Sequence, residues 1–261
     1  MSEFTLSLWQ GLIQGLTEFL PISSSGHLAI FQHLTGTGEP SLVFDLLLHL
    51  ATVCSTLVFF AKDIIKLLCE FFGGFIPGSE KGEGWRFGWA VIIGSVPTAL
   101  IGLFLEPMVK SASSSMFAVG VALAITGALM TLLCFVPQGQ RDINVLIGLA
   151  VGVAQGLAVF PGISRSGATI AAAILCGLEG AQAFRFSFLL SLPAIVGASL
   201  LEFLDADMSV ALPDGCYAAA AVAFISGIFA LFALRGAVVR GNFSTFAIYC
   251  FLLGGVAIFM L

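Results

Sequence analysis

The sequence has few charged residues. Only 10% of its 261 residues are Asp, Glu, Lys or Arg, whereas 59% are hydrophobic and the mean hydropathy is +1.08. Soluble domains carry about 25% charged residues. This composition therefore excludes a soluble globular protein and indicates an integral membrane protein. The ten Lys and Arg residues are dispersed along the chain, so we expect no nucleic-acid partner.

The sequence also has few closely spaced cysteines and few features typical of a secretory leader. The six cysteines are spread along the chain without a Cys-x-x-Cys pair, which indicates free apolar thiols rather than a redox or metal site. The N-terminus, Met1-Ser2-Glu3-Phe4, contains no basic segment and is followed by no small-residue cleavage site. We therefore expect no removed signal peptide.

Long apolar segments predict a single all-α polytopic membrane domain over residues 1–261. A spanning helix needs about 20 apolar residues, and six segments meet this requirement: about 42–61, 86–105, 114–136, 183–204, 215–235 and 243–261. Two further apolar segments, 5–36 and 143–178, are interrupted by Pro21 and Pro161. Proline removes a backbone donor and disfavours helix at the preceding residue, so each segment is expected to form helix, break and helix.

Each interrupted segment could be one kinked spanning helix or a re-entrant hairpin, and the distribution of basic residues favours hairpins. With two hairpins, eight basic residues fall on one side of the membrane and only Lys110 on the other, where the loop 205–214 is acidic. The eight are Lys62, Lys66, Lys81, Arg86, Arg141, Arg185, Arg235 and Arg240. Basic loops face the cytoplasm, so we predict both chain termini on the outside.

The two interrupted segments carry the same motif at a constant offset. Gln14-Gly15-Leu16 and Ile22-Ser23-Ser24-Ser25-Gly26 in the first match Gln155-Gly156-Leu157 and Ile163-Ser164-Arg165-Ser166-Gly167 in the second. We therefore predict two repeats, about 1–138 and 142–261, each with one hairpin and three spanning helices. Three crossings is an odd number, so the second repeat is inverted and the hairpin tips can meet near the membrane midplane.

The two tips concentrate reactive side chains at membrane depth. A charged group there costs about 2.5–3.5 kcal/mol when it is unpaired. Glu18 and Arg165 could form an ion pair that only locks the hairpins together. In the functional interpretation, Arg165 binds a phosphate with its planar fork of donors, and Ser24 is a nucleophile. His27 is a general acid or base, and Glu18 is a base or a metal ligand.

Smaller polar residues surround these four catalytic candidates. The candidate substrate-binding residues are Gln14, Ser23, Ser25, Gly26, Ser164, Ser166, Gly167 and Thr169. Small residues also serve helix packing, and that alternative applies to Ser23, Ser25 and Ser166 in particular. Together the groups suit transfer of a phosphoryl group from a lipid-borne substrate, because positioning and charge stabilisation dominate that chemistry.

These motifs resemble a known family. Gln14-x-x-x-Glu18, Pro21-x-Ser23-Ser24-Ser25-Gly26-His27 and Pro161-Gly162-x-Ser164-Arg165-Ser166-Gly167-x-Thr169 are similar to the two signature regions of the bacterial undecaprenyl-diphosphatase (bacitracin-resistance) family. The resemblance covers the whole chain and includes Phe44-Asp45 and His49-Leu50-Ala51-Thr52 of the first predicted spanning helix. Glu18, Ser24, His27 and Arg165 match the family's catalytic positions.

The resemblance implies hydrolysis of undecaprenyl diphosphate to undecaprenyl phosphate and phosphate, which recycles the lipid carrier for peptidoglycan. It also implies Mg²⁺ or Ca²⁺ as cofactor, with Glu18 as a ligand, and a bacterial inner-membrane protein whose site opens to the extracytoplasmic side. The family has Glu or Gln at position 14, and Gln14 here leaves only one carboxylate for a metal. Mg²⁺ often relies on one carboxylate, substrate oxygens and water.

Several alternatives stay open from the sequence. An inverted repeat with broken helices is also transporter architecture, so a polyprenyl-phosphate transporter or flippase is the second functional hypothesis. Asp45 and His49 are four residues apart and could form either a local hydrogen bond or a pair at the mouth of the site. A homodimer is possible.

Overall fold

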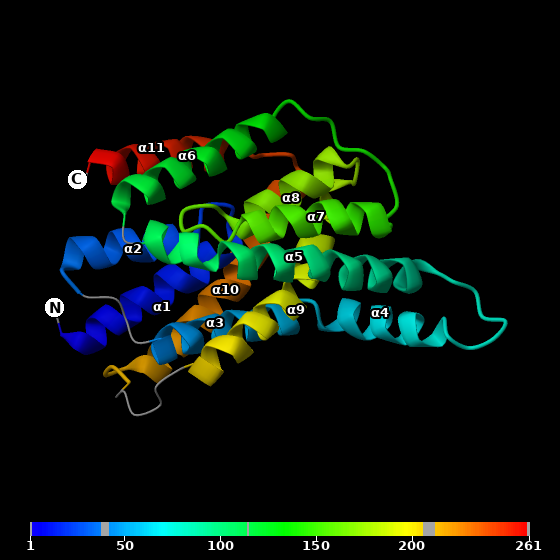
Figure 1. Cartoon of the computed structure of the whole chain (residues 1–261), viewed down its shortest axis with the longest axis horizontal. Coiled ribbons are helices and arrows are strands. Elements are labelled where there is room, and N and C mark those ends of the chain that lie inside the picture. The colour runs from blue at the N-terminus through cyan, green and yellow to red at the C-terminus, as the bar shows by residue number, and fades with distance from the viewer. Residues whose placement is uncertain (1, 38–41, 114, 206–211, 260–261) are drawn as a thin grey trace.

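In a computed structural model, the described residues are 2–37, 42–113, 115–205 and 212–259, and within them the chain is all helical. The helices lie roughly along one long axis (Figure 1). Their bounds are α1 Glu3–Phe19, α2 Ser24–Thr35, α3 Leu42–Phe59, α4 Ala61–Gly73, α5 Glu83–Ser113, α6 Met116–Leu133, α7 Val145–Leu157, α8 Arg165–Leu175, α9 Gly180–Asp205, α10 Cys216–Val239 and α11 Ser244–Phe259.

The predicted polytopic membrane fold is confirmed. Among the described residues, five helices are long and apolar enough to cross a membrane: α3, α5, α6, α9 and α10. They correspond to five of the six predicted spans. The sixth predicted span, 243–261, contains α11, whose 16 residues are apolar but shorter than the other five. The chain is therefore a multi-pass membrane protein.

Both interrupted segments fold as helical hairpins, named here hairpin 1 (α1 and α2) and hairpin 2 (α7 and α8). Pro21 lies in the break of hairpin 1. Hairpin 2 breaks at Pro161 and at Gly162, whose φ of 97° is in the region that favours glycine. Hairpin 1 extends inward from the end of the molecule that holds both chain termini, and hairpin 2 from the opposite end, near the loop between α4 and α5 (Figure 1).

The repeated motif adopts the same local structure twice. Ser23 caps α2 by accepting a hydrogen bond from the Gly26 amide at 3.3 Å. Ser164 caps α8 by accepting one from the Gly167 amide at 3.1 Å. The hydroxyl pairs Ser23–Ser25 and Ser164–Ser166 are each 3.2 Å apart. This equivalence is what a repeat would produce, while the inverted symmetry and the repeat boundaries at about 138 and 142 stay predictions.

Small residues let the first arm of each hairpin pack closely on a spanning helix. Gly11 of α1 lies so near α10 that an added Cβ would be 2.3 Å from the Ala219 carbonyl oxygen. Gly152 of α7 lies equally near α5, where an added Cβ would be 2.0 Å from the Gly94 carbonyl oxygen. Without a hydrophobic driving force between helices in lipid, such close backbone packing is what holds them together.

The sequence analysis did not predict α4, because the residues between the predicted spans 42–61 and 86–105 were interpreted as a loop, which its basic residues assigned to the cytoplasm. The helix has one strongly apolar face, and Ile65, Leu68 and Phe72 on it are exposed. Its Phe71 packs against Trp85 and Trp89 near the start of α5, with ring centroids 5.7 and 5.9 Å away.

Of the predicted outer loop 205–214, residues 206–211 lie outside the described residues, as does the side chain of Lys110.

Candidate active site at the hairpin tips

The carboxylate of Glu18 is the meeting point of three side chains. Gln14 donates to its Oε2 at 3.2 Å, and the Ser24 hydroxyl donates to the same oxygen at 2.5 Å. Arg165 donates through Nη2 to the other oxygen, Oε1, and forms an ion pair. The Glu18 side chain is only 7% exposed and the Arg165 side chain 26% exposed. Both carboxylate oxygens are thus engaged in a nearly enclosed cluster.

The local folding of the two hairpins explains how these residues meet. Gln14 and Glu18 are one turn apart near the end of α1, so they share a helix face. Ser24 and Arg165 are the first residues of α2 and α8 and occupy equivalent places in the repeated motif. The N-termini of both second arms therefore converge on Glu18, and helix N-termini favour negative charge.

Hydrogen bonds between the hairpins fix the relative position of the two tips. The Gly162 amide of hairpin 2 donates to Ser23 Oγ of hairpin 1 at 3.1 Å. The Ser166 hydroxyl donates to the Leu20 carbonyl at 3.3 Å. Thr126 of α6 supports hairpin 2, because it donates to the Gly162 carbonyl at 3.1 Å and accepts from the Ser164 amide at 3.0 Å. The site is therefore built across both halves of the chain.

The backbone of Ser23 is strained at the tip of hairpin 1. Its φ is 68°, and among the described residues no other non-glycine residue has a positive φ. Such a conformation costs on the order of 1–3 kcal/mol and persists only where the surroundings impose it. The bond from Gly162 and the buried position of Ser23 provide that constraint. The strained turn places Ser24 directly beside Glu18.

His27 lies one turn along α2 from Ser24, but both its ring nitrogens are engaged elsewhere. Nδ1 is 2.7 Å from the Ser23 carbonyl oxygen, and Nε2 is 2.7 Å from the Tyr249 hydroxyl of α11. The Ser24 hydroxyl instead donates to Glu18. The sequence analysis missed Tyr249, which is 222 residues from His27 and belongs to no recognisable motif.

Most of the predicted substrate-binding residues are buried and hydrogen-bonded within the protein. Thr169, for example, lies 2.5 Å from the Ser187 hydroxyl and donates to the Arg165 carbonyl at 2.8 Å. The buried members of the set are Gln14, Ser23, Gly26, Ser164, Ser166, Gly167 and Thr169, whereas Ser25 is exposed. Their contact with a substrate stays a prediction. Ser24, His27 and Arg165 are partly exposed at the same tips.

A divalent metal would rely on few protein ligands here. Within the described part of the chain, no group of three His, Cys, Asp or Glu side chains could hold a metal ion. The side-chain amide oxygen of Gln14, Oε1, is buried and has no hydrogen-bond partner among the described residues, and the same side chain contacts Glu18. One carboxylate and one amide oxygen, completed by substrate phosphates and water, fit the coordination of Mg²⁺.

Asp45 and His49 of α3 are joined by a local contact, since Nδ1 of His49 lies 3.0 Å from the Asp45 backbone carbonyl oxygen. This contact uses the backbone of Asp45, so the pairing of the two side chains at the mouth of the site stays a prediction. Both residues lie on α3, which packs against α1 of hairpin 1.

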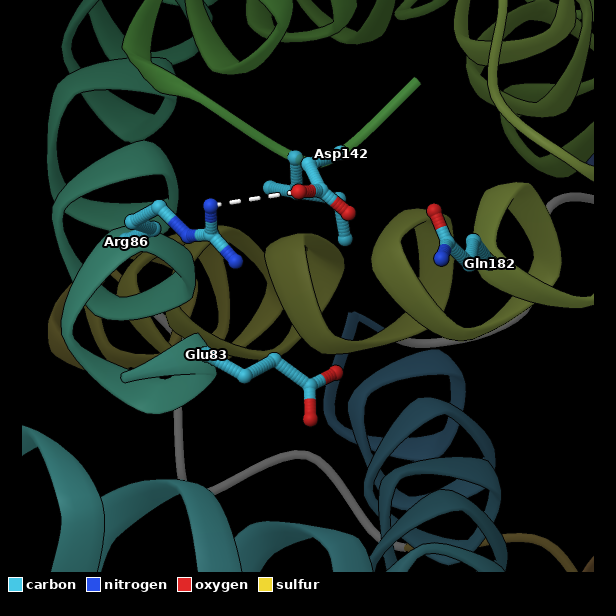
Figure 2. A pocket seen from close by; sticks show the side chains of 5 residues that line it. Glu83, Arg86, Asp142 and Gln182 are labelled. Carbon is cyan, nitrogen blue, oxygen red and sulfur yellow. Dashed lines mark hydrogen bonds and ion pairs between the residues drawn. The ribbon is translucent and has the colours of Figure 1, made fainter. Parts of the chain in front are cut away.

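A polar pocket lies at the start of α5, and its lining includes none of the residues of the Glu18 cluster. It has a volume of about 250 Å³ and is lined by Glu83, Arg86, Asp142, Ile143 and Gln182. Figure 2 shows Arg86 reaching across it to Asp142, and the two side chains form an ion pair at 3.2 Å. Glu83 is paired with Arg185 at 2.5 Å. No residue of the hairpin tips lines this pocket.

Known proteins are similar to this chain over nearly its whole length. Residues 7–256 match the family model described as "Bacitracin resistance protein BacA". The chain belongs to this family. It is 45% identical to a protein of Desulfosudis oleivorans named undecaprenyl-diphosphatase, with 96% of each chain covered. Proteins with the same name from Syntrophotalea carbinolica and Mycobacterium ulcerans are 41% and 35% identical, with at least 97% of each chain covered.

The BacA match includes every element that forms the site. It contains hairpin 1 from Ser7 onward, hairpin 2, α6 with Thr126 and the part of α11 that carries Tyr249. The resemblance seen in the sequence is therefore confirmed at the level of the family.

Proposed function

We propose that this BacA-family chain hydrolyses undecaprenyl diphosphate to undecaprenyl phosphate and inorganic phosphate. The names of its relatives support this reaction. The observation that carries it in this structure is the short hydrogen bond from the Ser24 hydroxyl to Glu18, with the Arg165 guanidinium beside it. A nucleophile, a base within hydrogen-bond reach and an oriented cation are the groups that phosphoryl transfer requires.

In the proposed mechanism, Ser24 Oγ attacks the terminal phosphorus of the substrate. Its proton moves to Glu18 Oε2, which already accepts its hydrogen bond. The bond from that phosphorus to the bridging oxygen breaks, and undecaprenyl phosphate leaves. Water then cleaves the phosphoserine to release phosphate and restore Ser24. Direct attack by water, with Ser24 acting only as a hydrogen-bond donor to the phosphate, is the competing route.

Arg165 would stabilise the charge on the transferred phosphoryl group. Its guanidinium is held at the N-terminus of α8 by the ion pair with Glu18. When Glu18 takes the proton from Ser24, it becomes neutral and the attraction between the two side chains weakens. The guanidinium fork is then free to engage the phosphoryl oxygens, which it can bind in a bidentate manner.

In the alternative role of Glu18, as a metal ligand and not as the base, its carboxylate and the unpartnered Oε1 of Gln14 would hold the divalent cation, Mg²⁺ or Ca²⁺, together with diphosphate oxygens. When bound, the cation would neutralise negative charge on the diphosphate and make its phosphorus easier to attack. Gln14 keeps Glu18 oriented by its amide N–H in either case.

The proposed activity recycles the lipid carrier for peptidoglycan and underlies bacitracin resistance. We further propose that the protein lies in the bacterial inner membrane with hairpin 1 entering from the extracytoplasmic side. The distribution of basic residues supports this orientation, because α4 carries Lys62 and Lys66 and the loop between α4 and α5 carries Lys81. The site would then receive the diphosphate from the outer leaflet.

The experiment is a phosphate-release assay of the purified protein in detergent, with a soluble short-chain prenyl diphosphate. We expect release that is stimulated by Mg²⁺ or Ca²⁺ and abolished by a chelator. Ser24→Ala purified in the same way controls for contaminating phosphatases. Absence of release from the wild type, in the presence of either cation, would contradict the proposed function and favour a transporter of polyprenyl phosphate.

A further inference from the structure

Tyr249 of α11 is in direct contact with His27 but is not part of the repeated motif. The two rings are nearly parallel, with an interplanar angle of 5° and centroids 5.5 Å apart. The Tyr249 hydroxyl lies 2.7 Å from Nε2 of His27. The neighbouring Cys250 contacts the Pro21 carbonyl oxygen at 3.6 Å, so α11 lies directly against the tip of hairpin 1.

The hydrogen bonds of His27 fix which nitrogen carries the proton in the neutral ring. Nδ1 faces the Ser23 carbonyl oxygen at 2.7 Å. A carbonyl oxygen can only accept a hydrogen bond, so Nδ1 must be the protonated nitrogen. Nε2 then has a free lone pair, and the Tyr249 hydroxyl must be the donor to it. Both contacts together hold one tautomer and one ring orientation.

We propose that Tyr249 is a positioning residue for His27, and this inference rests on the proposed phosphatase function with His27 in its predicted role of general acid or base. Because the Ser23 carbonyl occupies Nδ1, any proton that His27 exchanges during the reaction passes through Nε2. The Tyr249 hydroxyl donates to the lone pair of that nitrogen, so it fixes the direction in which Nε2 points while the ring is neutral. On protonation of His27, the same hydroxyl can reverse its hydrogen bond and accept from Nε2–H.

The chain offers a matched control, because its only other tyrosine is Tyr217. Tyr217 lies in α10 and is 74% exposed, and it takes no part in the site. Tyr249→Phe removes the hydroxyl and preserves the ring that stacks on His27. We expect it to lower kcat by about three- to tenfold with KM within twofold, as for loss of one hydrogen bond to a reacting group. Tyr217→Phe should change neither constant.

A double-mutant cycle separates positioning of His27 from general support of the fold. In a His27→Gln background, Tyr249→Phe should cause no further loss of kcat, because the group that it positions is already gone. An equal loss in both backgrounds would overturn the proposal. A raised KM with unchanged kcat would also overturn it, since the hydroxyl would then act on substrate binding. Wild-type values of both kcat and KM in Tyr249→Phe would overturn the proposal as well.

Nitrogen NMR of isotopically labelled histidine tests the pairing without any assay of activity. In the wild type, the His27 signals, assigned by their loss in His27→Gln, should report a single tautomer protonated at Nδ1. Tyr249→Phe should shift the Nε2 signal strongly, whereas Tyr217→Phe should not. An unchanged Nε2 signal in Tyr249→Phe would overturn the inference. If the wild type released no phosphate, the proposed function would fail while this spectrum still tested the contact.

Discussion

The Ser24 hydroxyl donates to Oε2 of Glu18 at 2.5 Å across the break between α1 and α2. The two residues are six positions apart in the sequence, and the strained turn at Ser23 brings them together. Arg165 of the second hairpin engages the other carboxylate oxygen. Glu18 is thus the residue that joins Ser24, the proposed nucleophile, from one half of the chain to the Arg165 guanidinium from the other.

We predict that Glu18→Gln lowers kcat by about 10²–10⁴, the usual contribution of a general base. The amide has nearly the same size but can neither take a proton from Ser24 nor pair with Arg165. Phosphate release by the purified variant measures the effect, and its response to added Mg²⁺ or Ca²⁺ should disappear with it. Activity close to that of the wild type would assign Glu18 to structural pairing alone.

Arg165→Lys removes the planar N–H donors of the guanidinium group while keeping the positive charge. A lysine ammonium can still neutralise Glu18 but cannot bind two phosphoryl oxygens in one plane. We expect turnover to fall by about 10²–10³, as for removal of a donor that stabilises transition-state charge, with the melting temperature in detergent nearly unchanged. Turnover near the wild-type value would mean that Arg165 acts only as an ion-pair partner.

The motif predicted the main site but not all of its surroundings. The repeated motif predicted that Glu18, Ser24 and Arg165 lie close together. The prediction was possible because Pro21 and Pro161 mark the breaks in the two hairpins, and these residues lie next to the breaks. Tyr249 could not be predicted in this way, since its contact with His27 depends on how α11 packs and not on local spacing. The helix α4 was not predicted for a different reason. Its segment is short and charged, so it was interpreted as a loop between two spanning helices.

The close packing of α7 on α5 can be tested with one methyl group. Gly152→Ala would place a Cβ 2.0 Å from the Gly94 carbonyl oxygen, so the two helices must separate. We expect a loss of about 1–3 kcal/mol of stability, as for overpacking elsewhere, measured as a lower melting temperature in detergent. Gly197→Ala in α9 is the control, because a Cβ there would meet no atom of the described residues within 4 Å. Equal melting temperatures for both variants would contradict the packing.

The orientation in the membrane is tested by cysteine labelling of intact cells with an impermeant reagent. In a variant whose six native cysteines are replaced by alanine, Asp214→Cys should be labelled directly. Glu80→Cys should react only after the membrane is permeabilised, because basic loops face the cytoplasm. Labelling of position 80 but not of position 214 in intact cells would reverse the proposed topology.

The most direct test of the proposed mechanism is rapid acid quench of a single turnover, with substrate labelled at its terminal phosphate. If Ser24 attacks that phosphorus with Glu18 as base, label should appear on the wild-type protein before phosphate is released. Ser24→Ala should carry no label while still binding the substrate. Label retained on Ser24→Ala, or no labelled wild-type protein at any quench time, would contradict attack by Ser24.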